Sequence, residues 1–316
     1  MAVQSNGTGF LSEFRRVSFT LLWIPVTLAA SLLQTARNLT QRSLTEVIGV
    51  VGATQVRFLF GLPFALIFLV LVCLGSGSLP PLPDLRSFGF AVFGALTQIL
   101  ATALMLAAMR ERSFAVTTAY TKTEPVQVAL FGTVLLGDAL GWPKFAAIVV
   151  ATAGVVLMSW KPGDKLSAAG LRPAALGIGA GAAFALSAIG FRGAIQALLD
   201  GHFLMRATTI LALGLALQTL LLTLYMLVAN RPALILSLRN WRRSLAAGFL
   251  GAAASQCWFL GFSLTTAANV RTLGLVEVPL AQIASRRIFS EGTSWRELAG
   301  MAMIVAGVGA LLLLAI

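Results

Sequence analysis

Long apolar runs, separated by short polar connections, follow one another along almost the whole chain. A helix needs about 20 mainly apolar residues to cross the hydrocarbon core of a bilayer. Because unpaired backbone groups are too costly in lipid, such runs cross it as helices. The sequence therefore predicts an all-α integral membrane protein with ten transmembrane helices. The runs lie at roughly 17–37, 47–74, 87–109, 114–136, 142–160, 172–198, 203–229, 243–264, 267–289 and 295–316.

Charge is scarce for a chain of this length. Charged residues make up 11% of the 316 residues, against about 25% in a typical soluble domain. The net charge is +12, but the basic residues are scattered between apolar runs, so we expect them at helix ends and expect no nucleic-acid partner. With Cys73 and Cys257 inside apolar runs and a single histidine, we expect no disulfide framework, no metal site and no cofactor.

The chain contains an internal repeat. Sliding the sequence against itself by 153 positions places Glu124 on Glu277, Trp142 on Trp295, Asp138 on Glu291, and Ala153-Gly154-Val155 on Ala306-Gly307-Val308. Arg57 and Arg206 match at an offset of 149. The sequence therefore predicts a polar tail at 1–16 and five-helix repeats at 17–160 and 172–316, joined by a linker at 161–171. Because five is odd, the second repeat is inverted, as in many secondary transporters.

Three segments carry a family resemblance: LWIPVTLAASLLQTARN in the first run, TAYTKTEPVQVALFGTVLLGDALGW, and its repeat LGLVEVPLAQIASRRIFSEGTSW. From about residue 17 to 316, the chain resembles the ten-helix branch of the drug/metabolite transporter (DMT) superfamily, with two EamA-type repeats. The resemblance implies a multi-pass protein of the bacterial inner membrane that moves a small solute by alternating access. It also implies a central cavity lined by the third, fourth, eighth and ninth spans.

Ionisable residues within membrane spans are costly, so they are the first candidates for function. Glu124 and Glu277 each lie near the middle of a run and close to a proline, Pro125 or Pro279. A proline can remove a helix hydrogen bond and mark a helix break. A carboxylate beside such a break can hold a cationic group or take up a proton, which makes protons a candidate coupling ion. Alternatively, each carboxylate is neutralised by an arginine and only holds helices together.

Arg57 and Arg206 are the repeat-related candidates for that neutralising role. Pairing Arg57 with Glu124 and Arg206 with Glu277 respects the repeat, and so does the swapped pairing. A third alternative is that the two guanidinium groups bind a carboxylate or phosphate of the solute, whose geometry they match.

Other polar residues surround these positions. Lys122 and Arg271 lie near the same two breaks but are not repeat-equivalent, which suits an asymmetric solute. Asp138 and Glu291 are expected to be solvated residues at helix ends. Further candidates for hydrogen bonding to a solute, or between helices, are Tyr120, Thr121, Thr123, Gln127, Gln98 and Gln256.

The orientation rests on two conflicting arguments. If the connections alternate sides, fourteen Lys and Arg residues, including Arg37, lie on one side and six, including Arg192 and Arg206, on the other. The positive-inside rule then places both termini outside, whereas the resemblance implies termini inside. We favour the charge count. A reporter fused to Ile316 that works only outside the cytoplasm should then be active, and a silent reporter would contradict this orientation.

The leading hypothesis is a secondary transporter, with export of an amino acid or a related polar or amphipathic solute. A membrane-embedded enzyme would need a nucleophile and base or metal ligands at depth, and the sequence shows no such set. A structural or assembly protein would not need repeat-related charges within its spans. A channel would need rings of charge, which are not evident, and no phosphate-cradling loop indicates ATP as the energy source. Oligomeric state cannot be read from the sequence.

Overall fold

The computed structural model describes residues 21–111, 120–159, 168–279 and 294–314. All regular structure in these ranges is helical. The predicted tail at 1–16, Glu291 and most of the predicted linker lie outside the described residues. The elements are α2 (Trp23–Leu59), α3 (Leu62–Ser76), α4 (Leu85–Glu111), α6 (Glu124–Leu136), α7 (Trp142–Ser159), α8 (Ala168–Ala197), α9 (Phe203–Ala229), α10 (Arg231–Arg239), α11 (Trp241–Leu264), α12 (Ala267–Leu273), η1 (Gly274–Val276) and α14 (Trp295–Leu313).

Six segments of the described chain are long and apolar enough to cross a membrane. They are Val51–Ser76, Leu85–Met105, Arg172–Ala197, Phe203–Ala229, Trp241–Leu264 and Trp295–Leu313. Two shorter apolar helices, Glu124–Leu136 and Trp142–Met158, add to them. Large apolar side chains such as Leu74, Val134 and Leu220 are exposed, as expected where lipid rather than water surrounds the protein.

Helix α2 departs from the predicted spans. The sequence indicates that a first span ends at residue 37, but α2 continues to Leu59. Charged residues at Arg37 and Arg42 suggested a connection, yet neither prevents helix formation. The helix is interrupted at Gly49, whose φ of 69° and ψ of 174° lie outside the helical region. Only glycine adopts this backbone conformation without strain.

Helix α10 is an element that the apolar runs did not predict, because it is short and follows α9 after one residue. Asn230 caps its first turn by accepting a hydrogen bond from the backbone N–H of Ala233 at 3.3 Å, and a proline occupies that turn, where none of the helix's own hydrogen bonds is lost. Ile235 and Leu238 are about half exposed on this helix.

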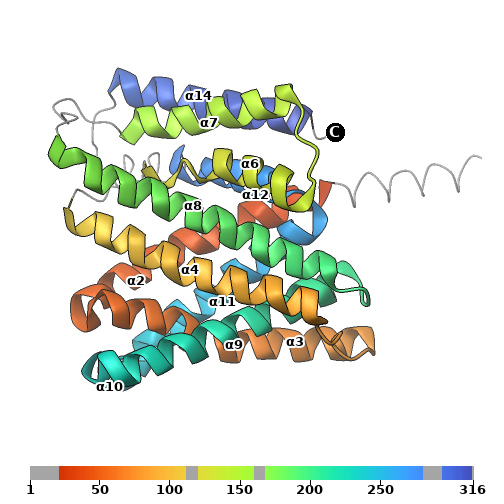
Figure 1. The fold of residues 1–316 in the computed structure, drawn as a ribbon, viewed down its shortest axis with the longest axis vertical. Coiled ribbons are helices and arrows are strands. Elements are labelled where there is room, and N and C mark those ends of the chain that lie inside the picture. Colours follow the sequence, from red (N-terminus) through yellow and green to blue (C-terminus); the bar gives the residue numbers. More distant parts are fainter. Residues whose placement is uncertain (1–20, 112–119, 160–167, 280–293, 315–316) are drawn as a thin grey trace, which may run out of the picture.

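The helices lie side by side, with α7 and α14 at one end of the bundle and α3, α9 and α10 at the other (Figure 1). Helix α4 packs along α8, α2 along α11, α7 along α14 and α3 along α9. Glycines allow some of these helices to approach closely: a Cβ atom at Gly190 on α8 would lie 2.8 Å from the Cα of Gly94 on α4. Such close approach through small residues is a common way of packing helices in lipid.

Candidate functional site: two ion pairs at two helix breaks

Glu124 begins a helix that follows a break in the chain. A turn precedes α6, in which the backbone N–H and side-chain hydroxyl of Thr123 both donate to the carbonyl of Tyr120, at 3.3 and 2.7 Å. Pro125 lies in the first turn of α6, where a proline costs no helical hydrogen bond. The break therefore precedes Pro125 rather than arising from a bond that Pro125 removes. The Glu124 side chain is buried at the positive end of the helix dipole.

Glu277, which the sequence offset of 153 positions matches to Glu124, also follows a break. Helix α12 ends at Leu273, the 3-10 turn η1 covers Gly274–Val276, and Glu277 directly follows it. A Cβ atom on Gly274 would lie 2.7 Å from the Trp258 ring, so glycine allows this turn to pack on α11. Pro279 is two residues beyond Glu277, again just after the break. Both carboxylates thus stand at the start of the segment that follows a break.

Two ion pairs cross between these breaks. The ammonium group of Lys122 contacts Oε1 of Glu277, and Nε of Arg271 lies 3.1 Å from Oε1 of Glu124. The four side chains are between 12 and 20% exposed. The second pair is close enough to be an ion pair but is not aligned as a hydrogen bond, since both atoms lack a hydrogen-bond partner. We therefore treat it as charge attraction.

These partners differ from the predicted ones. Under one alternative, the sequence offered Arg57 and Arg206 as the neutralising cations, in either pairing, and the structure shows Lys122 and Arg271 in that role. The prediction was wrong because repeat symmetry governs backbone position, whereas the reach of a side chain across the bundle depends on packing. The alternative in which ion pairs hold helices together describes this geometry, with other cations.

A glutamine and a tryptophan connect the two pairs, and sequence reasoning missed both. The indole N–H of Trp258 on α11 donates to the side-chain oxygen of Gln34 at 3.1 Å, and the amide nitrogen of Gln34 donates to Glu277 at 3.4 Å. The guanidinium carbon of Arg271 lies 4.7 Å from the centroid of the Trp258 ring, within cation–π range. Gln34 in the first apolar run was a polar residue at depth, which is the signal that could have identified it.

Two arginines of α2 lie beside the ion pairs. Arg37 is close enough to Glu277 and Arg271 to interact with their charges, and Arg57 to interact with Arg37 and Arg271. Arg37 is only 7% exposed. The expectation that Arg37 is a basic loop residue was therefore wrong, because α2 continues through it. The cluster formed by Arg37, Arg57, Lys122, Arg271, Glu124 and Glu277 is called the charged cluster below.

Arg206 lies elsewhere, near the start of α9, where its guanidinium donates to the carbonyl of Leu198 at 3.4 Å. The glutamines connect helices: Gln98 accepts a hydrogen bond from Gln218, and Gln256 donates to Thr208 at 2.9 Å.

Tyr120 and Gln127 contact helix α8. A Cβ atom on Gly177 would lie 2.6 Å from the Cβ of Tyr120. The Gln127 amide donates to Thr123 at 3.2 Å and to the Ile178 carbonyl at 3.5 Å. These two candidates therefore help to join the first break to α8.

Asp138 was expected to be a solvated end residue, and the structure corrects this. Both of its carboxylate oxygens accept from Arg192 of α8, at 2.7 and 2.8 Å. Arg192 also donates to the carbonyl of Thr265, which follows α11, at 3.0 Å. The Arg192 side chain is 8% exposed. Arg192 therefore joins three parts of the bundle. The charge count placed Arg192 at the end of a span, whereas its side chain is buried between helices. Without Arg37 and Arg192 that count is thirteen against five.

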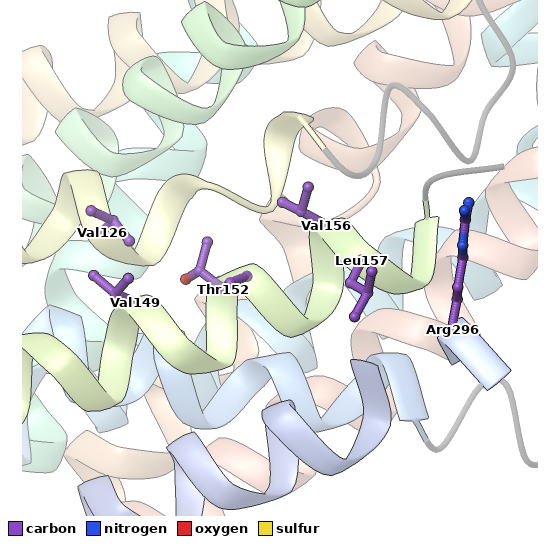
Figure 2. A pocket seen from close by; sticks show the side chains of 7 residues that line it. Val126, Val149, Thr152, Val156, Leu157 and Arg296 are labelled. Carbon is purple, nitrogen blue, oxygen red and sulfur yellow. The ribbon is translucent and has the colours of Figure 1, made fainter. Parts of the chain in front are cut away.

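A groove of about 650 Å³ has no member of the charged cluster in its lining. Its lining comes from α6, α7 and the start of α14, and Figure 2 shows these side chains: Val126, Val149, Thr152, Ala153, Val156, Leu157 and Arg296. The lining is mostly apolar, so it offers little to orient a polar solute. We therefore assign the chemistry to the charged cluster rather than to this groove. No group of His, Cys, Asp and Glu suited to a metal ion occurs among the described residues.

Comparison with known proteins gives a family for the first half of the chain. Residues 21–160 match the EamA-like transporter family, and this range contains Lys122 and Glu124. No curated protein matches the sequence. A crystal structure of a protein 16% identical in sequence has a similar fold, with a TM-score of 0.70, and the match covers 94% of this chain and 99% of that chain. Residues 21–160 therefore carry an EamA-like transporter domain in a chain that spans the membrane several times, which supports a place among the drug/metabolite transporters.

Proposed function

We propose that the protein is a secondary transporter that exports a small metabolite, an amino acid or a related polar or amphipathic solute, by alternating access. The observation that carries this proposal is the pair of ion pairs, Lys122 with Glu277 and Arg271 with Glu124, at two helix breaks. Ionisable side chains at depth in a membrane protein are costly and mark solute or ion pathways. Broken helices are a common way to build a transporter site.

The proposal includes two inverted five-helix repeats, 17–160 and 172–316. Exchanging the repeats turns α4 into α11 and α8 into α2. The two close pairs α4 with α8 and α2 with α11 then exchange with each other. In the other two pairs, α7 with α14 and α3 with α9, the exchange turns each helix into its own partner. This pattern of packing is what a two-fold relation between the repeats requires.

The glycine contacts between α7 and α14 repeat in the same way. A Cβ atom on Gly154 would lie 2.6 Å from the Gly300 carbonyl and 2.9 Å from the Ile304 nitrogen. One on Gly307 would lie 2.6 Å from both the Ala147 carbonyl and the Ala151 nitrogen. The sequence offset of 153 positions matches Gly154 to Gly307, Ala147 to Gly300 and Ala151 to Ile304. The contacts of Gly307 with α7 are therefore the repeat equivalents of the contacts of Gly154 with α14. These contacts support a pseudo-two-fold axis that passes between α7 and α14.

The ion pairs suggest how the repeats work against each other. Each pair joins a cation of one repeat to a carboxylate of the other, so rocking of the repeats must lengthen or break both. A freed carboxylate can then bind an ammonium group of the solute or take up a proton. We infer that breaking and remaking these pairs accompanies each cycle, with protons as the coupling ion.

The test is solute flux in proteoliposomes with an imposed proton gradient. Glu124→Gln and Glu277→Gln each remove one carboxylate charge but keep its size, and we expect at least about a tenfold loss of flux because the charge-assisted contact is lost. Asp84→Asn is the matched control: Asp84 is exposed and accepts from the backbone N–H of Ser87 at 2.7 Å, a role that asparagine can keep.

Folding is checked by size-exclusion chromatography and by the unfolding temperature of each variant. If both glutamine variants fold and transport at the rate of the wild type, the carboxylates are not central to transport. If flux depends on the two carboxylates but not on the proton gradient, transport stands and only the proposal of proton coupling is contradicted.

A further inference from the structure

The described part of the charged cluster contains more positive than negative charge. It holds four cations, Arg37, Arg57, Lys122 and Arg271, and two carboxylates. Each carboxylate already has its own ion-pair partner, Lys122 or Arg271. Arg57 therefore adds positive charge to a set of ion pairs that is already balanced.

The stems of these two arginines converge on one point of α11. A Cβ atom built on Gly251 would lie 3.5 Å from Cδ of Arg37 and 3.5 Å from Cγ of Arg57. Each of the two arginines also interacts with the charge of Arg271. Glycine at this position leaves room for both side chains beside the helix.

Arg57 keeps a donor without a partner. Its Nε is buried and makes no hydrogen bond within the described residues. A buried donor that forms no hydrogen bond is unfavourable, and more so on a charged group. Like charges brought together away from water add to this cost. An anion placed against Arg57 would remove both costs.

We propose that the transported solute carries an oxyanion, a carboxylate or a phosphate, and that Arg57, with Arg37 beside it, binds that group. The planar guanidinium fork can donate two parallel hydrogen bonds to either oxyanion. The inference rests on the proposed function and narrows its substrate class. Glu124 and Glu277, across the cluster, then suit a solute that also has a cationic group, as an amino acid does.

The test uses the purified full-length protein and pairs of probes that differ in one oxyanion. The carboxylate arm compares leucine with leucinamide and succinate with succinamide, and the phosphate arm compares glycerol 3-phosphate with glycerol. We expect the oxyanion of at least one pair to raise the unfolding temperature and to bind in calorimetry, while its neutral partner does neither. The arm that responds identifies the oxyanion. Equal binding of both partners in every pair, or binding by none of the oxyanions, overturns the proposal.

Variants locate the site. Arg57→Gln should weaken binding of the responding probe at least about tenfold, because a charge-assisted hydrogen bond is lost. Arg57→Lys keeps the charge but not the planar guanidinium fork, so its affinity for the probe should lie between those of the wild type and Arg57→Gln. It also tests the site if Arg57→Gln fails to fold. Arg86→Gln, at an exposed position in the first turn of α4, is the control and should bind as the wild type does. Unchanged binding in both Arg57 variants, or loss only in Arg206→Gln, contradicts the assignment.

Flux separates this inference from the proposed function. Oxyanion binding that depends on Arg57 without any flux in proteoliposomes supports the anion site and contradicts transport. Flux of neutral or purely cationic solutes that is unaffected by Arg57→Gln supports transport and contradicts the anion site.

Discussion

Glu124 and Glu277 occupy equivalent places in their segments, yet the cations beside them are not equivalent. Lys122 precedes Glu124 by two residues and Arg271 precedes Glu277 by six, and each cation contacts the carboxylate of the other repeat. Arg271 also lies against the Trp258 ring, a contact for which Lys122 has no counterpart among the described residues. The two sides of the charged cluster therefore differ chemically, which suits a solute with two different ends.

At this scale the sequence predicted positions better than partners. Intramembrane charge alone pointed to Glu124, Glu277, Lys122 and Arg271. It did not show which cation meets which carboxylate, because that depends on how α12 packs against α6. It also missed Gln34 and Trp258, since the bond between them joins residues 224 positions apart. It missed Arg37 because α2 continues through a position that was assigned to a connection.

The Arg192 pair with Asp138 makes a prediction about stability. Arg192→Leu should lower the free energy of unfolding by about 3 kcal/mol, because removing one partner of a buried pair leaves the other charge uncompensated. It also removes the donor to the Thr265 carbonyl. Denaturant unfolding in detergent micelles measures the change, and Arg86→Gln, an exposed arginine, should change it by less than about 0.5 kcal/mol. Equal stability of the two variants would mean that the pair contributes little.

Helix α14 offers two glycines, two residues apart, with opposite surroundings. A Cβ atom on Gly307 would lie 2.6 Å from backbone atoms of α7, whereas one on Gly309 would meet nothing within 4 Å. Replacing each glycine by alanine therefore distinguishes the effect of helix packing on stability from the effect of helix propensity, within one helix.

Gly307→Ala should lower the unfolding free energy by about 1–3 kcal/mol through overpacking. Gly309→Ala should be neutral or stabilising by up to about 1 kcal/mol, since alanine favours a helix more than glycine does. Thermal unfolding of both variants in the same detergent measures the difference. A Gly307→Ala protein as stable as Gly309→Ala would contradict the close packing of α7 and α14.

Several elements could be predicted from apolar runs alone. The predicted span at 203–229 coincides with α9, because a continuous apolar run is bounded there by polar residues. The joined helix α2 and the short helix α10 could not be predicted in this way. Both contain charged residues that a hydropathy argument assigns to connections, although arginine is a good helix former.

For the whole molecule, the described residues support a helical membrane protein whose charged cluster draws on α2, α6 and α12 and the turns beside them. The helix pairs and the two ion pairs are the observations that support the proposed repeats and their proposed rocking about a shared site. A channel would instead need a continuous path across the membrane. A structural protein would have no need to break the ion pairs of the charged cluster.

Solute counterflow tests alternating access most directly. Proteoliposomes are loaded with an excess of the unlabelled probe that binds the protein, diluted, and given a trace of labelled probe outside. A carrier that exposes its site to one side at a time should accumulate label transiently above equilibrium, and Glu277→Gln should lose this overshoot. Label that only approaches equilibrium, at a rate independent of the internal probe, would contradict alternating access and indicate a channel; no entry above protein-free vesicles would contradict transport.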